Sequence, residues 1–273
     1  MGFIRSFDKK QIYALQSEQN KSIYNLLISD IKDGKVFPSV RKNQIYFYYE
    51  GGCLYKFANG KFTRDKAYEK YSCSTEDSTR YETAKIQVEN RFSKGEKNDK
   101  ERRLLNALYR YTYSGEKPYD TVVLDIEVNL NSTFVGRKKC DLVLYNTQSS
   151  EIMFVEGKIF SDRRVSVRIG FIPEVISQVN TYSAAIAEQQ QAILTQYANH
   201  IEIINNLFGM NYSAPKKLIQ PAKLLVYEAP LSPTDNSIYT FNTITAALGK
   251  NNAVWFKQNE RPTTDEIWNS LCK

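Results

Sequence analysis

Three ionisable residues in the middle of the chain, Asp141, Glu156 and Lys158, have types and spacing that suit divalent-cation chemistry. Residues two apart in a β-strand point to the same face, so Glu156 and Lys158 share a face and Gly157 points to the other. The three residues before Glu156 are apolar (Met-Phe-Val), and charges that follow a buried strand are costly unless they are paired or coordinated. We therefore expect these charges to have partners or a ligand.

The chemistry that these residue types favour is that of a hard cation held by carboxylate oxygens. Mg²⁺ takes oxygen ligands and usually keeps several waters, so two carboxylates leave positions open for water and for a phosphate oxygen. The cation would help to activate an attacking water and would neutralise charge on phosphorus. A neighbouring lysine would orient the water or stabilise the charged transition state. We expect Mn²⁺ to substitute for Mg²⁺.

Three successive strands must position these residues. Their sequences are TVVLDIEVNL, RKKCDLVLYN and EIMFVEGKIF, joined by short polar segments. Short connections favour antiparallel neighbours, so a β-meander is predicted. If the second and third strands pair through the TQSS turn, Asp141 lies close to Glu156 and Lys158 at one end of the sheet.

Helical segments are predicted on both sides of the meander. Residues 76–112 have a helical composition, with a charged segment around Gly95 that breaks them into two helices. A long helical region begins near Pro173, which suits a first helical turn. The apolar strand AKLLVYEA follows, then a strand NAVWFKQ and a short helix TTDEIWNSL. The predicted order is helix, three strands, helix, strand.

The first 75 residues differ in character. Residues 1–35 favour one or two amphipathic helices, and the aromatic segment after them, with turns at Gly51-Gly52 and Asn59-Gly60, favours a small antiparallel sheet. Tyrosines such as Tyr46 and Tyr48 could stack on bases. Tyrosine also fits well in a half-buried sheet, and we favour that interpretation.

The spacing of Asp141, Glu156 and Lys158 resembles the D…(D/E)-X-K signature of the PD-(D/E)XK nuclease superfamily. Cys140 stands where that signature has proline, and Gly157 stands where an apolar residue is typical. The departure at Gly157 bears on the packing behind the site rather than on its ligands.

A second motif extends the resemblance to the RecB-like branch of that superfamily. Gln178 and Tyr182 are similar to its Q-x-x-x-Y motif, and residues four apart share a helical face. The resemblance implies that this face looks toward the site and adds both residues to the catalytic set. It covers about residues 76–230.

The resemblance implies a fold, an activity and a cofactor. The expected fold is α/β, with a restriction-endonuclease-like αβββαβ core and a mixed central sheet in residues 76–273, and a small β-rich (α+β) domain in residues 1–75. The implied activity is metal-dependent hydrolysis of DNA phosphodiester bonds with Mg²⁺ on Asp141 and Glu156. The alternatives are a non-catalytic nucleic-acid-binding protein that keeps the nuclease fold, and an unrelated interaction protein in which the motif is accidental.

The superfamily often adds an acidic residue from the helix before the first strand. Glu101 is the first choice for this metal-binding role, and Glu82, farther upstream, is another candidate. Glu127, on the first strand, is the second choice, where alternation places it on the same face as Asp125. A solvent-facing strand position explains Glu127 equally well.

Basic residues bracket the expected centre. Arg137, Lys138 and Lys139 precede Asp141, and Arg163, Arg164 and Arg168 follow Lys158. Guanidinium groups suit phosphate contacts, and the net charge of +7 with a pI near 9.0 favours a polyanionic partner such as DNA. The alternative is a solvated basic loop.

Other features exclude some classes of site. The single histidine, His200, excludes sites that need a His pair, and the spacing of the four cysteines does not suit zinc. The chain starts without a secretory signal and has no apolar stretch of about 20 residues, so we expect a cytoplasmic protein without a membrane span. Cutting both strands of a duplex would favour a homodimer.

Overall fold

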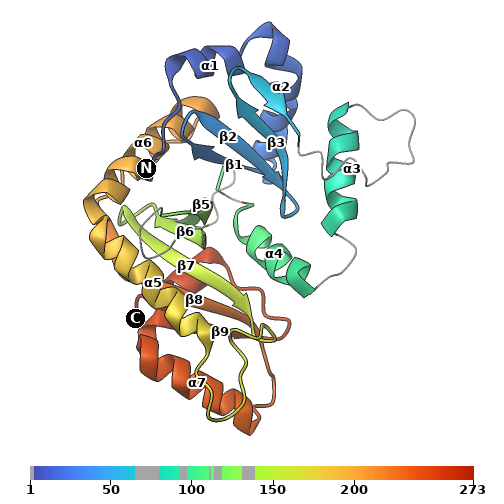
Figure 1. Cartoon of the computed structure of the whole chain (residues 1–273). Coiled ribbons are helices and arrows are strands. Elements are labelled where there is room, and N and C mark those ends of the chain that lie inside the picture. Colours follow the sequence, from blue (N-terminus) through green and yellow to red (C-terminus); the bar gives the residue numbers. More distant parts are fainter. Residues whose placement is uncertain (1–2, 65–79, 93–96, 111, 114–118, 131–138) are drawn as a thin grey trace. The chain divides into compact units, whose positions relative to one another are not determined.

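The computed structural model describes residues 3–64, 80–92, 97–110, 112–113, 119–130 and 139–273 (Figure 1). Within these residues the chain is α/β, with eight α-helices and two sheets. It divides into two compact units. The mixed-sheet unit comprises Met1–Phe3, Tyr119–Thr195 and Pro215–Lys273, and the antiparallel-sheet unit comprises Ile4–Pro118 and Gln196–Ala214.

The antiparallel-sheet unit confirms the predicted N-terminal helices and meander. Its four strands pair in the order β1-β2-β3-β4, all antiparallel. Alternation along β2 buries Ile45 and Phe47, whereas Tyr46 and Tyr48 are half-buried and stack on each other. The elements are α1 (Lys9–Leu15), α2 (Glu18–Lys32), β1 (Val36–Arg41), β2 (Gln44–Tyr49), β3 (Gly52–Ala58), β4 (Lys61–Thr63), α3 (Arg80–Phe92) and α4 (Lys97–Leu108).

The expected boundary between residues 75 and 76 lies outside the described residues. The predicted break in the 76–112 helical region is present, because α3 ends at Phe92 and α4 begins at Lys97. Both helices belong to the antiparallel-sheet unit, whereas the sequence analysis grouped them with residues 76–273.

The mixed-sheet unit contains the predicted three-stranded meander. Strands β5 (Thr121–Val128), β6 (Cys140–Asn146) and β7 (Glu151–Ile159) pair antiparallel in chain order. Strand β8 (Lys217–Ala229) pairs parallel with β7, and β9 (Ala253–Lys257) pairs parallel with β8. The expected mixed central sheet is therefore confirmed, in the order β5-β6-β7-β8-β9.

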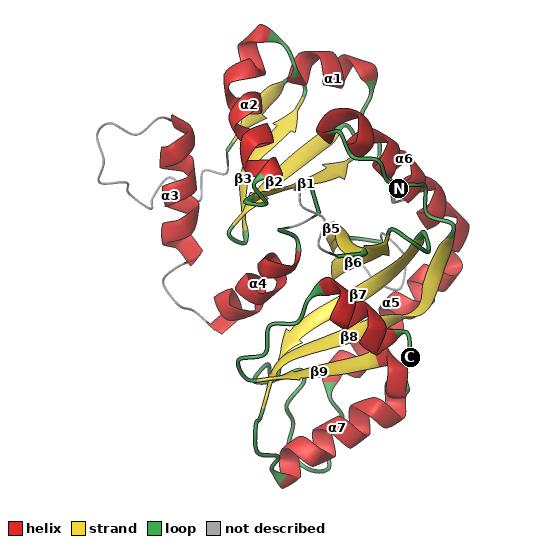
Figure 2. Cartoon of the chain, turned by 180° about the vertical axis from the view of Figure 1, so that it is seen from behind, coloured by secondary structure: helices red, strands yellow, loops and turns green. Residues whose placement is uncertain are grey.

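Helices cover both faces of this sheet, which explains why its central strands are almost wholly apolar. Helix α5 (Glu174–Glu188) lies on one face, and α8 (Thr264–Leu271), near the C-terminus, lies on the other (Figures 1 and 2). The β7 residues Ile152, Phe154 and Val155 are fully buried between these layers. Helix α6 (Gln190–Phe208) follows α5 and completes the crossover that lets β8 run parallel to β7.

Two features of the mixed-sheet unit differ from the sequence expectation. Helix α7 (Asp235–Leu248) was not predicted, because its sequence is rich in Ile, Thr, Phe and Tyr, which are weak helix formers. It begins at a capping box between Thr234 and Ser237, with serine where the usual pattern has Glu or Gln. Strand β8 starts at Lys217, five residues before the expected segment 222–229. Among the described helices, none combines the length and apolar character that a bilayer crossing requires.

Candidate active site

The pairing of β6 with β7 places Asp141 beside Glu156. The antiparallel register runs from Asn146 opposite Glu151 to Leu142 opposite Val155. Asp141 and Glu156 come one residue beyond this last pair. There, Asp141 Oδ2 accepts a hydrogen bond from the Gly157 backbone N–H at 2.9 Å. The spatial proximity expected from the TQSS turn is therefore present.

The Lys158 ammonium group bridges the two carboxylates. Its Nζ lies 2.5 Å from Glu156 Oε1 and 3.3 Å from Asp141 Oδ2, and it also donates to the Gly157 carbonyl at 2.6 Å. The side chains of Glu156 and Lys158 are 1% and 2% exposed, whereas that of Asp141 is 24% exposed. Asp141 is thus the member of the trio that solvent reaches.

Helix α5 holds the buried carboxylate from above the sheet. Gln178 Nε2 donates to Glu156 Oε1 at 2.5 Å and to the Tyr182 hydroxyl at 3.1 Å. Tyr182 in turn donates to the Lys139 carbonyl at 2.7 Å. Burial, and then the charge of Glu156, raise the pKa of Tyr182, so the hydroxyl keeps the proton that it donates. The Q-x-x-x-Y pair therefore ties α5 to both β6 and β7.

Cys140, beside Asp141, is not a nucleophile. Its side chain is fully buried, and its thiol lies 3.8 Å from the Leu142 carbonyl. Burial raises the pKa of this thiol well above its ordinary value, and the negative charges of Glu156 and Asp141 raise it further. Because the thiolate is the reactive form of cysteine, Cys140 serves packing.

Glu127, on β5, lies opposite Asp141 on the neighbouring strand β6. Its neighbours Ile126 and Val128 pair with Leu142 and Cys140, the residues on either side of Asp141. The Glu127 carboxylate forms an ion pair with the Lys139 ammonium at 2.9 Å. The second-choice carboxylate is therefore on a strand next to the trio.

The expected alternation of Asp125 and Glu127 is interrupted in β5. The register shifts between Val123 and Asp125, and Glu127 has a positive φ of 48°. Asp125 is fully buried and accepts a hydrogen bond from the Ile126 N–H at 2.9 Å, whereas Glu127 is partly exposed. The two carboxylates consequently occupy different environments.

The first-choice supporting carboxylate belongs to the other unit. Glu101 lies on α4, where it is partly exposed, and Glu82 lies on α3, where its carboxylate is 3.7 Å from the Lys85 ammonium. Both helices belong to the antiparallel-sheet unit, so the supporting role of Glu101 or Glu82 stays a prediction.

The basic residues expected to bind phosphate fall into three groups. Arg137 and Lys138 lie outside the described residues, and Lys139 is paired with Glu127. The Arg164 guanidinium is held by the Asp162 carboxylate through three hydrogen bonds of 3.0, 3.2 and 2.5 Å. Arg163 and Arg168 are exposed. Among the described members of the set, these two guanidinium groups are the best placed to meet a polyanion.

Asp162 has a role that the sequence analysis missed. Burial raises the pKa of this carboxyl, but the hydrogen bonds from Arg164 outweigh that effect and lower the pKa below its ordinary value. The carboxylate also accepts the Arg164 backbone N–H at 2.8 Å, which shapes the start of the loop after β7. The sequence feature that could have indicated this ion pair is an acidic residue two positions before an arginine, in the segment that follows β7.

Comparison with known proteins gives no family for this chain. It matches no protein-family model, no curated protein and no solved structure.

The donor set around Lys158 fits a small divalent cation. The described residues contain no group of three or more His, Cys, Asp and Glu side chains that could hold a metal. Mg²⁺ does not require such a group, because one or two carboxylates with water and substrate oxygens commonly bind it. Asp141 and Glu156 already share one cationic group, the Lys158 ammonium, which shows that both can face a single positive charge.

Proposed function

We propose that this chain is a metal-dependent nuclease that hydrolyses DNA phosphodiester bonds, built on a restriction-endonuclease-like core of the PD-(D/E)XK type. The observation that carries the proposal is the meeting of Asp141, Glu156 and Lys158 within hydrogen-bonding distance at one end of β6 and β7. A buried acid and a buried lysine beside a partly exposed acid are unusual in a sheet whose neighbouring residues are apolar.

The order of the elements supports the proposed core. Three antiparallel strands, β5 to β7, lead into α5, and β8 then pairs parallel with β7. With α4 before β5 in the chain, this is the order αβββαβ, apart from the additional helix α6. The proposed catalytic residues stand on the second and third strands and on the helix that follows them.

Each residue has a distinct part in the proposed reaction. Asp141 and Glu156 would hold Mg²⁺, which when bound supplies charge neutralisation on the phosphate and activates water. Gln178 fixes the Glu156 carboxylate, and Tyr182 fixes the amide of Gln178. Lys158 would donate to the substrate phosphate or to the attacking water once it leaves its place between the carboxylates.

A second candidate keeps the nucleic-acid partner and omits cleavage. The observation that favours it is the near-complete burial of Glu156 and Lys158, which a purely structural ion pair would also show. Exposed Arg163 and Arg168 would serve binding in either case.

Cleavage assays separate the two candidates. The purified full-length chain is incubated with supercoiled plasmid, linear duplex and single-stranded DNA in Mg²⁺, in Mn²⁺ or with a chelator. We expect cleavage that the chelator and Asp141→Asn each abolish. The matched control is Glu151→Gln, which removes an acid outside the trio from β7, the strand of Glu156 and Lys158.

The outcomes point in different directions. Cleavage that survives both Asp141→Asn and Lys158→Met would refute the proposed site. Tight binding of DNA without cleavage in either metal would favour the second candidate. Binding is measured by fluorescence anisotropy of a labelled duplex, so it does not depend on activity.

A further inference from the structure

The loop between β7 and α5, residues 160–173, exposes large apolar side chains. Ile169, Phe171 and Ile172 are 58%, 63% and 77% exposed. We call these three residues the apolar tip. Large apolar side chains that gather on a surface usually mark a place where another molecule binds, whereas scattered single ones do not.

Hydrogen bonds fix the backbone of this loop, so the fold itself keeps the apolar tip exposed. Val165 is fully buried, and its N–H donates to the Asp162 carbonyl at 2.9 Å. The Phe171 N–H donates to the Arg168 carbonyl at 3.1 Å, and the Ile169 N–H donates to Asn236 Oδ1 at 3.3 Å. The tip is therefore presented on an anchored turn.

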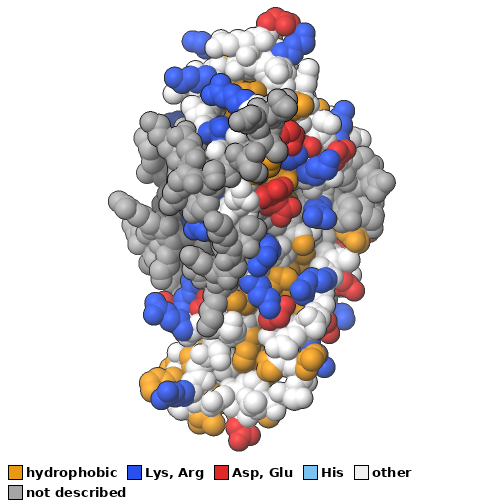
Figure 3. All heavy atoms as spheres, turned by 90° about the vertical axis from the view of Figure 1, so that its right-hand side faces the viewer, with side chains coloured by type: hydrophobic (Ala, Val, Ile, Leu, Met, Phe, Trp, Pro, Cys, Tyr) orange, Lys and Arg blue, Asp and Glu red, His pale blue; other side chains and the backbone are white. Residues whose placement is uncertain are grey.

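Charge on the same loop indicates the kind of partner. Arg163 and Arg168 are exposed and make no ion pair within the described part of the chain. Figure 3 shows hydrophobic and basic side chains beside one another on part of the face that it displays. A surface that combines apolar and guanidinium groups suits a partner that combines flat apolar rings with anionic groups, which is the composition of DNA.

The loop is continuous with the candidate active site at both of its ends. It starts one residue after Ile159, which follows Lys158 directly. It ends at α5, on which Gln178 contacts Glu156. Helix rise and chain geometry place Ile172 no more than about 13 Å along the chain from Gln178, which is within a few base steps of DNA.

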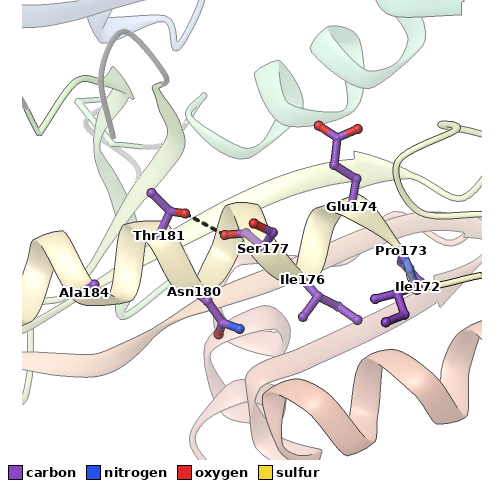
Figure 4. Close-up of a pocket in the computed structure, with 8 residues that line it drawn as sticks. All are labelled: Ile172, Pro173, Glu174, Ile176, Ser177, Asn180, Thr181 and Ala184. Carbon is purple, nitrogen blue, oxygen red and sulfur yellow. Dashed lines mark hydrogen bonds between the residues drawn. The ribbon is translucent and has the colours of Figure 1, made fainter. Parts of the chain in front are cut away.

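A shallow groove follows the tip along α5. Its volume is about 790 Å³. Its lining includes Ile172, Glu174, Ile176 and Asn180, and Figure 4 shows Glu174 projecting to the opposite side of the helix from Ile176 and Asn180. Apart from Glu174, the lining side chains are apolar or small and polar, and such side chains suit unpaired bases and sugars better than they suit a charged backbone.

We propose that the apolar tip is a wedge that enters duplex DNA beside the phosphate to be cut, stacking on bases and separating the strands there. This inference rests on the proposed nuclease function. Apolar side chains inserted between base steps unstack them, and aromatic side chains stabilise unpaired bases by stacking. Arg163 and Arg168 contact the adjacent phosphates in this arrangement.

The first test compares a fully paired duplex with a forked duplex of the same sequence, whose end is already unpaired. The tip variant is Phe171→Ser with Ile172→Ser in the full-length chain. The control is Tyr13→Ser, which removes an equally exposed aromatic side chain from the antiparallel-sheet unit. We expect the ratio of paired to forked cleavage rates to fall about tenfold in the tip variant, since the fork no longer needs a wedge. An unchanged ratio overturns the wedge.

The second test does not depend on cleavage. A duplex with 2-aminopurine near its end is mixed with the Lys158→Met protein in Mg²⁺, with and without the tip substitutions. We expect a rise in 2-aminopurine fluorescence that the tip substitutions abolish. A protein that binds this duplex without any rise contradicts the wedge.

These tests separate failure of the wedge from failure of the proposed function. If the wild-type chain cuts neither duplex in Mg²⁺ or Mn²⁺, the nuclease proposal fails and the fluorescence measurement alone decides about the wedge. Two further outcomes also overturn it. One is a dimer in sedimentation that the tip substitutions convert to a monomer, and the other is binding to phosphatidylglycerol vesicles that the same substitutions abolish.

Discussion

Strand β7 contributes the glutamate of two Glu–Lys pairs that have similar lengths and opposite environments. Glu151 and Lys217 lie 2.7 Å apart at the exposed start of the strand, with the lysine largely in solvent. Glu156 and Lys158 lie 2.5 Å apart near its end, and both are buried. An exposed pair contributes little to stability, while a buried pair carries a desolvation cost that its attraction offsets only with good geometry. We infer that the buried pair is retained for what its charges do, and that the exposed pair is a surface contact.

The largest difference should appear in activity. Asp141→Asn or Lys158→Met should lower the DNA cleavage rate by about a thousandfold, because each removes a group that acts on the developing charge. Glu151→Gln and Lys217→Met should leave the rate unchanged. Initial rates on linear duplex in saturating Mg²⁺ provide the measurement. Equal losses of cleavage rate in the buried-site variants and in the Glu151 and Lys217 variants would show that the buried pair has no special role in activity.

The second difference concerns stability. Glu156→Ala removes one partner of the buried pair and should lower the free energy of unfolding by about 3 kcal/mol, since Lys158 stays buried with Asp141 as its remaining carboxylate. Urea unfolding followed by circular dichroism measures the loss.

A double substitution sharpens that result. Replacing both members, as Glu156→Met with Lys158→Met, should cost less than the sum of the two single changes. Each single change leaves one buried charge of the pair without its partner, whereas the double change removes both charges. Additive losses would show that the two side chains do not interact energetically.

Metal binding should distinguish the pairs as well. Mn²⁺ at about one hundred times its dissociation constant should stabilise the wild-type chain by about 2.7 kcal/mol. Asp141→Asn should remove most of this gain, whereas Glu151→Gln should retain it. Thermal unfolding with and without Mn²⁺ gives the comparison, and a gain that is the same in Asp141→Asn would place the ion elsewhere.

Tyr182 offers a smaller effect. Tyr182→Phe removes the hydroxyl that donates to the Lys139 carbonyl and accepts from Gln178, which should cost about 1 kcal/mol of stability. Because Gln178 then holds Glu156 less firmly, cleavage should slow by a few-fold. Loss of stability with an unchanged rate would reduce Tyr182 to a packing role.

The smallest effect depends on pH. Asp162 has a lowered pKa in the folded chain, so its interaction with Arg164 contributes stability above the unfolded value of about 3.9 and loses it as the pH falls through the folded value. Asp162→Asn should therefore cost up to about 1 kcal/mol near neutral pH and almost nothing once the pH has fallen below the folded pKa. Unfolding of both proteins across this range is the check, and a cost that persists at low pH would contradict the assignment.

The sequence predicts the strands of the mixed sheet well because their pattern is unambiguous. Apolar runs separated by TQSS and other polar turns specify β5 to β7, and the position of Asp141 beside Glu156 follows from the turn length. Gln178 reaches Glu156 because four-residue spacing on α5 keeps it on the same face as Tyr182.

Other features depend on tertiary contacts that no local pattern encodes. Helix α7 forms despite weak helix formers because it packs against α5 and β9, and tertiary packing overrides propensity. The bulge and positive φ in β5 break the alternation that was used to place Asp125 and Glu127. The bridging position of Lys158 and the exposure of Phe171 follow from three-dimensional packing, and sequence alone gives neither.

Diffraction from crystals soaked in Mn²⁺, with anomalous data to locate the ion, tests the proposed metal site most directly. If Asp141 and Glu156 hold the ion, a peak should lie within about 2.2 Å of a carboxylate oxygen of each residue, with the Lys158 ammonium displaced from between them. A Lys158 that still bridges the two carboxylates, with no ion at either, would contradict the proposed site.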